Sequence, residues 1–402
     1  MRKYFVILTL GCIALAASSD EGLDGRRISL EAGGHVTLNA PLTLPCDAVI
    51  GPNQRVTMFH SRTSKYFPAT IRNGEITVIP EGALANSSHT FSIQVQNEVR
   101  PPHVQIREGA NADTLDVYID DVHFTTYHHS NENRKPFLWP VLSDGSVPIT
   151  RAWPMGEAED KIDHPHHKSL WSAYGEVNGA DCWGEGKNAG YQLSGDVTFG
   201  SGDAYGWIEA KNTWTDTEKN PVVDEAREYR FYTGKPSARL FDVVVTFTAK
   251  YGDVEFSDTK EGGIVAVRVR DQIRADRGGV ITNAEGMQGE GETWGVASPW
   301  CDYSGEIEGE GQHGITVFDH PGNLRHPSRW HVRNYGLMGA NCFGLSYFTK
   351  GKGDLNGDYE LKGGETLTFR YRVYVHSGDV EKAKVADRYA DYATPPKVAW
   401  VE

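Results

Sequence analysis

Residues 238–257, ARLFDVVVTFTAKYGDVEFS, decide the fold that the sequence predicts. Apolar side chains recur at every second position from Phe241 to Phe247, which is the period of a β-strand that buries one face. The turn signal Tyr251-Gly252-Asp253 follows, and a further strand-like run comes after it. The stretch therefore predicts antiparallel strands connected by tight turns.

Strand-like segments of the same kind follow one another along most of the chain. Almost no helical period interrupts them, apart from one helix expected over residues 379–392. Asp379 is its expected N-cap, and Val380, Ala383, Ala386 and Tyr389 or Ala390 line one face. This succession predicts an all-β fold, a large antiparallel β-sandwich. The other expected strands lie within residues 114–127, 135–142, 190–200, 205–215, 222–233, 262–271, 313–320 and 366–376.

The chain of 402 residues is long enough for two domains. Residues 19–103 contain short alternating runs at 35–44, 74–80 and 89–99, and Pro101-Pro102 forms a stiff linker after them. We therefore expect a small β-sandwich module over 19–103 and a large β-sandwich domain with a C-terminal helix over 104–402.

The first 18 residues have the features of a secretory signal peptide. Arg2 and Lys3 precede an apolar run that is too short to cross a bilayer, and small residues then offer a cleavage site. A lipid anchor at Cys12 is disfavoured, because the residues before it match a lipoprotein signal poorly. We expect a periplasmic or secreted protein without a later membrane span.

Charge and cysteine content narrow the choice of partners. The formal net charge of −14 disfavours nucleic acids and anionic membranes, which bind basic surfaces. Cys46, Cys182, Cys301 and Cys342 show no zinc-binding spacing, and both free thiols and disulfides remain open. The many aromatic residues suit a carbohydrate partner, because flat rings stack on sugars.

The first candidate site is DHPHHKSLW at residues 163–171, which holds three of the 15 histidines. In an extended segment His164 and His166 would point one way, and Asp163 and His167 the other. Pro165 places the segment on an edge strand or in a loop. The alternative is a solvated loop whose histidines bind the backbone. The aromatic and amide residues that follow are further candidates, namely Trp171, Tyr174, Asn178 and Trp183.

Two further stretches could meet this one. FDHPGNLRHPSRWHVRNYG, residues 318–336, carries His320, Arg325, His331 and Arg333, and the alternative is that it forms an unrelated surface turn. NAEGMQGEGETWG, residues 283–295, carries Glu285, Glu290 and Trp294. A carboxyl group beside an indole has a raised pKa and can act as a general acid, whereas the alternative is an acidic surface loop.

A metal site is a weaker prediction. Neutral imidazoles bind zinc, iron or copper, but the chain has no HExxH sequence or other specific ligand signature. No cofactor is therefore assigned, and a divalent metal remains open.

Several motifs together are similar to one family. KPFLWPVL, DHPHHKSLWSAYGEVNGADCW, DTKEGGIVAVRVRD, GGVITNAEG, GETWGVASPWCDYSG, FDHPGNLRHPSRWHVRNYG and ETLTFRYRVYVHSG occur in the order typical of the PmoA-like group, a family of unknown function also labelled "methane oxygenase PmoA". The resemblance covers roughly residues 105–395. Methane oxidation does not follow from it, because that reaction belongs to a membrane-integral protein.

The resemblance implies an exported bacterial protein of sugar degradation, often associated with sugar oxidoreductases. It also implies a large β-sandwich similar to the galactose-mutarotase type. The family's arginine and glycine after DHPHH are replaced here by Lys168 and Ser169. Carried over by position, the site residues are Asp163, His164, His166, His167, Glu285, His320, Arg325, His331 and Arg333.

The function expected from the sequence is an exported carbohydrate-active enzyme that cleaves glycosidic bonds, as a glycoside hydrolase or a lyase. In elimination, a histidine of residues 163–167 removes a proton, Arg333 or Arg325 stabilises the enolate, and Glu285 or His331 protonates the leaving oxygen. In hydrolysis, Glu285 is the acid and Asp163 the base. The catalytic candidates are Asp163, His164, His166, His167, Glu285, His320, His331 and Arg333. The substrate-binding candidates are Trp139, Trp171, Tyr174, Asn178, Trp183, Glu290, Trp294 and Arg325.

Two other functions remain open from the sequence. A non-catalytic carbohydrate-binding module explains the aromatic residues but not the many titratable groups beside them. A metal-dependent sugar epimerase or oxygenase requires a bound metal. The glycan, its linkage and the oligomeric state are not determined by the sequence.

Overall fold

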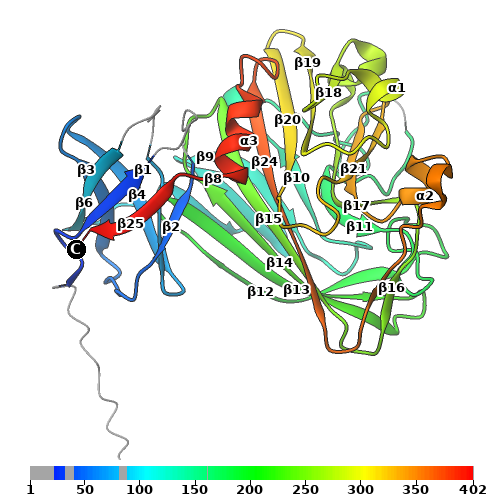
Figure 1. Ribbon diagram of the computed structural model, residues 1–402, viewed down its shortest axis with the longest axis horizontal. Helices are drawn as coiled ribbons and strands as arrows, with labels where there is room; N and C mark the ends of the chain where they lie inside the picture. The colour runs from blue at the N-terminus through cyan, green and yellow to red at the C-terminus, as the bar shows by residue number, and fades with distance from the viewer. Residues whose placement is uncertain (1–21, 32–39, 81–87, 161, 402) are drawn as a thin grey trace, which may run out of the picture.

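The computed structural model describes residues 22–31, 40–80, 88–160 and 162–401, and its regular secondary structure consists mainly of antiparallel strands (Figure 1). The expected all-β fold is confirmed. The predicted signal peptide, with Cys12, lies outside the described residues. None of the helices in the described ranges is both long and apolar enough to span a bilayer.

Two large antiparallel sheets, each of eight strands among the described residues, face each other in the sandwich. The first sheet has the order β21-β22-β17-β11-β10-β9-β8-β7, and the second has the order β12-β13-β14-β15-β24-β20-β19-β18. The strands of the first sheet are β7 (Val104–Glu108), β8 (Thr114–Ile119), β9 (Val122–His128), β10 (Phe137–Val141), β11 (Leu170–Tyr174), β17 (Gly262–Arg268), β21 (Arg329–Arg333) and β22 (Leu337–Asn341). The strands of the second sheet are β12 (Tyr191–Gly200), β13 (Tyr205–Thr215), β14 (Pro221–Tyr232), β15 (Ala238–Thr248), β18 (Val280–Asn283), β19 (Trp300–Ile307), β20 (Gly311–Asp319) and β24 (Thr366–Ser377).

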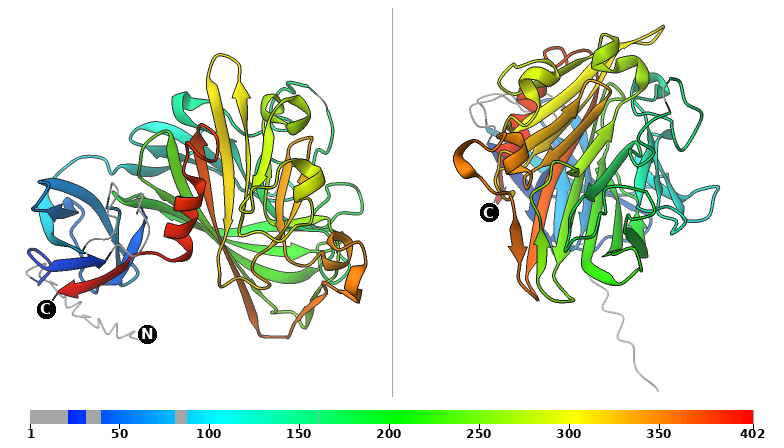
Figure 2. Two further views of the ribbon diagram at one scale, coloured as in Figure 1. Left: turned by 45° about the horizontal axis from the view of Figure 1, so that its top comes forward. Right: turned by 90° about the vertical axis from the view of Figure 1, so that its right-hand side faces the viewer.

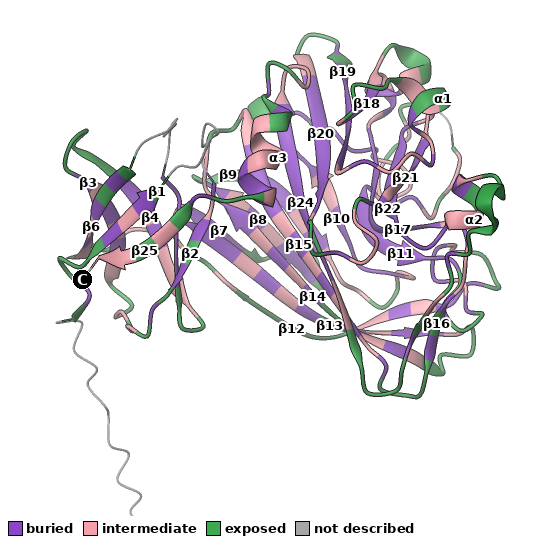
Figure 3. Cartoon of the chain, in the orientation of Figure 1, coloured by how far each residue is buried: buried purple, intermediate pink, exposed green. Residues whose placement is uncertain are grey.

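Strand β15 shows why these sequences form sheets. Phe241, Val243, Val245 and Phe247 are buried in the core between the sheets, and the residues between them are only partly buried. The same alternation of buried and less buried positions runs along the neighbouring strands (Figure 3). After the predicted turn at 251–253 the chain continues as β16 (Val254–Phe256), which pairs with β23 (Tyr359–Leu361).

A third sheet, the small sheet, lies at one end of the sandwich and has its own apolar core (Figures 1 and 2). The sequence assigned residues 104–402 to the large domain. In the structure, however, β25, near the C-terminus, belongs to the small sheet and pairs with β1, near the N-terminus. Arg72 of this sheet donates a hydrogen bond of 2.9 Å to Glu228 of the second sheet. The described strands of the small sheet are β1 (Arg27–Glu31), β2 (Leu42–Pro45), β3 (Gln54–His60), β4 (Lys65–Arg72), β5 (Glu75–Val78), β6 (Ser88–Asn97) and β25 (Lys397–Val401).

The C-terminal helix begins later than the sequence predicted. Oδ1 of Asp379 accepts the backbone N–H of Lys382, as the side chain of an N-cap does, but turns and not a helix follow it directly. Lys384 then adopts a positive φ of 54°, which ends the turn, and α3 runs from Val385 to Ala393. Two shorter helices lie near the first sheet's β21 edge: α1 (Gly289–Thr293) contacts β21 directly, and Phe348 of α2 (Leu345–Phe348) packs near His331 of β21.

Candidate functional site

The face of the first sheet that points away from the second sheet, called the outer face here, carries the candidate site. The strand register places Phe137, Trp171, Ala266, Gly339 and His331 in one row across five neighbouring strands. The residues next to them along each strand belong to the sandwich core, so side-chain alternation turns this row outward. A separate apolar cluster, which includes Trp171, Ala266 and Trp183, covers the row.

The histidine-rich segment is a turn that lies against this face. The backbone N–H of His167 donates to the carbonyl of His164 at 3.0 Å, and His164 has a positive φ of 42°. The alternation expected for an extended segment is therefore not realised. The rings of His164 and His167 are stacked 4.8 Å apart, and His166 packs edge-on against both. All three predicted histidines thus share one cluster.

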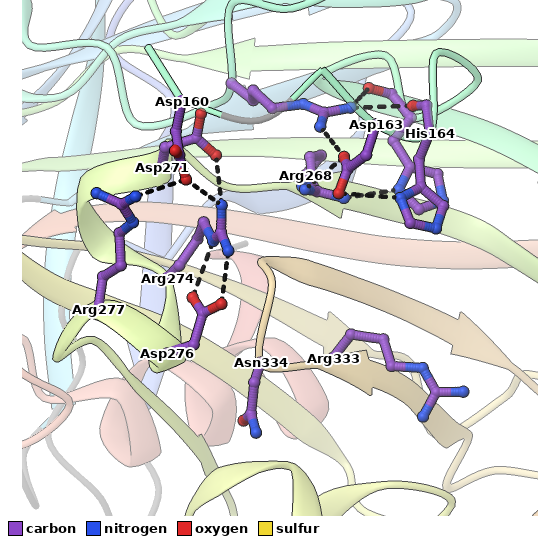
Figure 4. Close-up of polar contacts among 12 residues, drawn as sticks. Asp160, Asp163, His164, Arg268, Asp271, Arg274, Asp276, Arg277, Arg333 and Asn334 are labelled. Atoms are coloured by element: carbon purple, nitrogen blue, oxygen red, sulfur yellow. Dashed lines mark hydrogen bonds and ion pairs between the residues drawn. The ribbon is translucent and has the colours of Figure 1, made fainter. Parts of the chain in front are cut away.

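Two buried arginines hold the carboxylate of Asp163 (Figure 4). Its Oδ1 accepts hydrogen bonds of 2.6 Å from Arg151 and 3.0 Å from Arg268. Burial raises the pKa of this carboxyl group, but the charge of Arg268 and the hydrogen bond from Arg151 lower it more, and the net pKa lies below its ordinary value. Asp163 is therefore a fixed anion at neutral pH.

The second oxygen of Asp163 faces His164. Oδ2 lies 3.3 Å from Nδ1 of that imidazole, close enough for an ion pair but without a well-formed hydrogen bond, and the His164 side chain keeps 38% of its surface exposed. A carboxylate behind one ring nitrogen stabilises the imidazolium that forms when the other nitrogen takes a proton. The ring of Tyr335 stacks on His164 at 4.8 Å and 16°, which fixes its orientation further.

His167 and His166 differ from His164 in burial. Arg268 donates to Nδ1 of His167 at 3.1 Å, and because a guanidinium only donates, the proton of neutral His167 must sit on Nε2. Burial is the main reason that the pKa of His167 is well below 6.5. Burial, followed by the charge of Lys135, lowers the pKa of His166 to about 3. Both rings are neutral at physiological pH.

A second charged group lies behind these histidines. Lys135 is fully buried, donates to the carbonyl of Trp183, and lies 3.7 Å from Glu185, which also lies 3.4 Å from Lys168. Burial lowers the pKa of Lys135 to about 8, while Glu185 opposes that change. Lys168, where the resemblance implied arginine, makes this contact as a single point charge.

Tyr335, in the turn between β21 and β22, joins the histidine cluster to a second group. Arg268 lies over its ring at 4.7 Å from the centroid, and the charge of Arg333 also acts on its phenol. Arg333 forms an ion pair of 2.9 Å with Glu290 and lies over the ring of Trp294 at 5.4 Å. The structure thus brings Glu290, Trp294 and Arg333 next to the histidine cluster.

His331 lies on the same outer face but is almost completely buried. Burial, followed by the charge of Arg333, lowers its pKa to about 3. It packs near Phe348 of α2, which also contacts Trp294. A buried neutral imidazole is a poor acid for a leaving group, so the expected role of His331 as the acid has no support here.

Other predicted residues lie elsewhere. Glu285 is exposed in a turn and forms no hydrogen bond or ion pair among the described residues. Arg325 donates to the backbone carbonyls of Cys342 and Gly357, and His320 accepts the N–H of Gly322 within its own turn. These three side chains are not brought to the histidine cluster, because each is engaged locally or faces solvent.

Two substrate-binding candidates form hydrogen bonds away from the histidine cluster, and a third lies beside it. The Tyr174 hydroxyl, on the core side of β11, donates to the carbonyl of Ser257. Asn178 bonds the backbone of Asp253 and Glu255 at an exposed turn. Trp139 is half-buried beside the cluster that contains Trp171 and Trp183, so it alone of the three stays near the site.

The basic groups that organise the site were not predicted from the sequence. Arg151, Arg268 and Lys135 were not selected, although each is buried. Arg268 had a detectable signal, because it is a charged residue at the end of the apolar strand 262–268. Nearby, Arg274 binds Asp160 at 3.0 Å, so a second ion pair anchors the loop that carries the histidines (Figure 4).

Several buried N–H groups near the histidine cluster have no hydrogen-bond partner within the part of the chain that the structure describes. The buried indole N–H groups of Trp171 and Trp183 and Nε of Arg268 have no hydrogen-bond partner among the described residues. Buried polar groups are normally satisfied, so these donors leave hydrogen-bonding capacity beside the histidine cluster. Within the described ranges no group of three His, Cys, Asp or Glu side chains has the arrangement of a metal site. The four described cysteines are buried and unpaired.

Comparison with known proteins gives one match. The sequence profile of a family described as "Family of unknown function (DUF6807)" matches residues 114–390, which include both eight-stranded sheets except β7. No curated protein matches the chain.

Proposed function

The chain belongs to DUF6807, a family of unknown function, and we propose from the geometry of its site that this member is a carbohydrate lyase. The reaction is β-elimination of a glycosidic oxygen from a sugar that carries a carbonyl or carboxylate group. The observation that carries the proposal is the pairing of half-exposed His164 with Asp163, which two buried arginines hold in place. The earlier resemblance to PmoA-like proteins of sugar degradation agrees with this substrate class.

His164 is the proposed general base. Its Nδ1 faces the Asp163 carboxylate, so Nε2 is the nitrogen that takes the proton from the carbon next to the carbonyl group. Asp163 then stabilises the imidazolium. His166 and His167 are less suitable bases, because burial keeps both pKa values far below neutrality and a weakly basic imidazole removes a carbon-bound proton poorly.

The remaining charges can support the rest of the reaction. As the proton leaves, the electron pair forms a carbon–carbon double bond and the β carbon–oxygen bond breaks. The cations Arg268 and Arg333 both act on Tyr335 and favour the developing negative charge. The leaving oxygen takes its proton from Tyr335, whose pKa burial raises against the effect of Arg333 and Arg268, so that the phenol is protonated at neutral pH.

The hydrolytic alternative has less support from the geometry. It requires Glu285 as the acid and Asp163 as the base. Glu285 is exposed in a separate turn, and both arginines bind Asp163 in the form of a fixed anion. A non-catalytic carbohydrate-binding role explains the aromatic residues but gives no reason for the Asp163–His164 pair.

The experiment is a turnover screen with the purified protein. Oxidised disaccharides, including 3-keto and uronate sugars, are incubated with wild type, His164→Ala and Tyr335→Phe. Mass spectrometry separates the mechanisms, because elimination gives an unsaturated product one water lighter than the hydrolysis product. His320→Ala is the matched control, since His320 lies outside the cluster. Export, expected from residues 1–18, is part of the same proposal and is tested by cell fractionation.

A further inference from the structure

A second group of side chains on the outer face is linked to the histidine cluster through Arg333 and Tyr335. It consists of His331, Trp294, Phe348 and the ion pair between Arg333 and Glu290. Strand β21 supplies His331 and Arg333 from one side of its backbone, and the segment after α1 supplies Trp294. We call this group the His331 cluster.

Two buried polar groups in the His331 cluster lack good partners. His331 is 2% exposed, and neither of its ring nitrogens makes a well-formed hydrogen bond to a described residue, although the backbone of Lys260 acts on its pKa. The indole N–H of Trp294 is also buried without a partner among the described residues. Both side chains pack against Phe348. Unsatisfied groups this close together are unfavourable unless a ligand or water bonds to them.

The chemistry of the group suits a neutral sugar. A neutral imidazole both donates and accepts a hydrogen bond, and an indole N–H donates one, which matches sugar hydroxyl groups. The ion pair between Arg333 and Glu290 is about a quarter exposed on each side and offers further donors and acceptors next to them. Partly exposed Trp294 adds aromatic ring surface of the kind that packs on sugars, and buried Phe348 supports it.

The strand register gives the distance between one backbone position beneath the histidine cluster and one in the His331 cluster. Arg268, beneath the histidine cluster, is aligned with Leu337, which is aligned with Arg333. Two strand spacings therefore separate Arg268 from Arg333, about 10 Å in all. Tyr335 lies between these cations and touches the histidine cluster. A ligand that reaches both groups must span this distance, as two linked sugar rings can.

We propose that the His331 cluster is a second sugar subsite, so that the enzyme's substrate is a disaccharide or longer oligosaccharide. The oxidised ring lies at His164, and the neighbouring unmodified ring binds at His331 and Trp294. The scissile bond is then next to Tyr335. This inference rests on the proposed function for the placement of the reacting ring, but it makes a separate statement about binding.

The test measures binding in protein that cannot turn over its substrate. His164→Ala protein is titrated by calorimetry with 3-keto cellobiose and with the 3-keto form of methyl β-glucoside, and with the corresponding maltose and methyl α-glucoside pair. We expect one of the two disaccharides to bind at least about tenfold more tightly than its methyl glycoside, which is the effect of one or two good hydrogen bonds with ring packing. Adding Trp294→Phe or His331→Leu should abolish most of that difference and leave methyl glycoside binding unchanged.

Matched controls make the result specific. Trp207→Phe alters a half-buried indole of β13 that lies under Arg72, away from this face, and should keep the disaccharide preference. Circular dichroism checks the fold, and Trp294→Phe remains the milder variant if His331→Leu does not fold. A disaccharide preference that is absent, or unchanged in folded Trp294→Phe protein, overturns the inference. Lack of turnover by wild type, with the preference present, overturns only the lyase proposal.

Discussion

The carboxylate of Asp163 and the guanidinium of Arg268 lie 3.0 Å apart, although 105 positions separate them in the chain. Arg268 is completely buried at the end of β17, and Asp163 lies in the loop that carries the histidines. A buried cation needs a counter-ion, so the core strand determines where this loop can sit. The ion pair thus links the stability of the sheet to the position of the proposed base.

Replacing the central carboxylate should be costly for stability. Asp163→Asn removes the charge that compensates two guanidinium groups with almost no exposed surface, Arg151 and Arg268. We expect a loss of about 3 kcal/mol or more in the free energy of unfolding, measured by urea denaturation. Glu159→Gln is the control, because the ion pair between Glu159 and Arg270 is more exposed and should contribute about 1 kcal/mol or less.

The same carboxyl group gives a pH dependence with a definite sign. Its folded-state pKa is lower than its ordinary value, so its contribution to stability is complete above that ordinary value, about 4, and is lost as pH falls through the folded pKa. Denaturation at a series of acidic pH values should show wild-type stability falling more steeply than that of Asp163→Asn. Parallel curves for the two proteins would contradict the ion-pair description.

Lys135 should destabilise the fold when it is charged, whereas Asp163 stabilises the fold when it is charged. Burial lowers its pKa to about 8, so the unfolded chain binds more protons than the folded one between about pH 8 and 10.5. Wild-type stability should therefore rise across this window relative to Lys135→Met, by up to about 3 kcal/mol. Difference denaturation curves at pH 7, 9 and 10.5 test this, and a difference that does not change with pH would rule it out.

Glu285 and Arg325, which the sequence predicted to belong to the site, should be dispensable for catalysis. Glu285→Gln changes an exposed side chain and should leave both stability and turnover unchanged. Arg325→Ala removes hydrogen bonds to the carbonyls of Cys342 and Gly357, so it should lower the melting temperature while kcat of the folded protein stays near wild type. A large fall in kcat for either variant would place the reaction elsewhere on the molecule.

Periodicity predicted the fold well, because strands with one buried face carry their own signal. Phe241, Val243 and Val245 of β15 show it clearly. The start of α3 was missed because the positive φ of Lys384 depends on the tertiary fold around it. The pairing of β25 with β1 was also missed, since a contact between the two ends of the chain leaves no local pattern.

The site was predictable only where its residues are neighbours in the sequence. His164, His166 and His167 were selected by residue type and lie together, but the alternation that pointed His167 away from the other two was wrong. Arg151 and Arg268 act through long-range contacts with Asp163, so their role appears only when the strands are paired. The prediction that Glu285 belongs to the site was wrong for the opposite reason. Glu285 is near Trp294 in the sequence, but neighbours in the sequence need not share a site in space.

The central claim is that His164, held by Asp163, removes a carbon-bound proton in an elimination reaction. The most direct measurement is mass spectrometry of the products that wild type and His164→Ala form from oxidised disaccharides in deuterated water. The account predicts an unsaturated product one water lighter than the hydrolysis product, formed at least about a hundredfold more slowly by His164→Ala. A hydrated product from the wild type, or the same rate for both proteins, would contradict it.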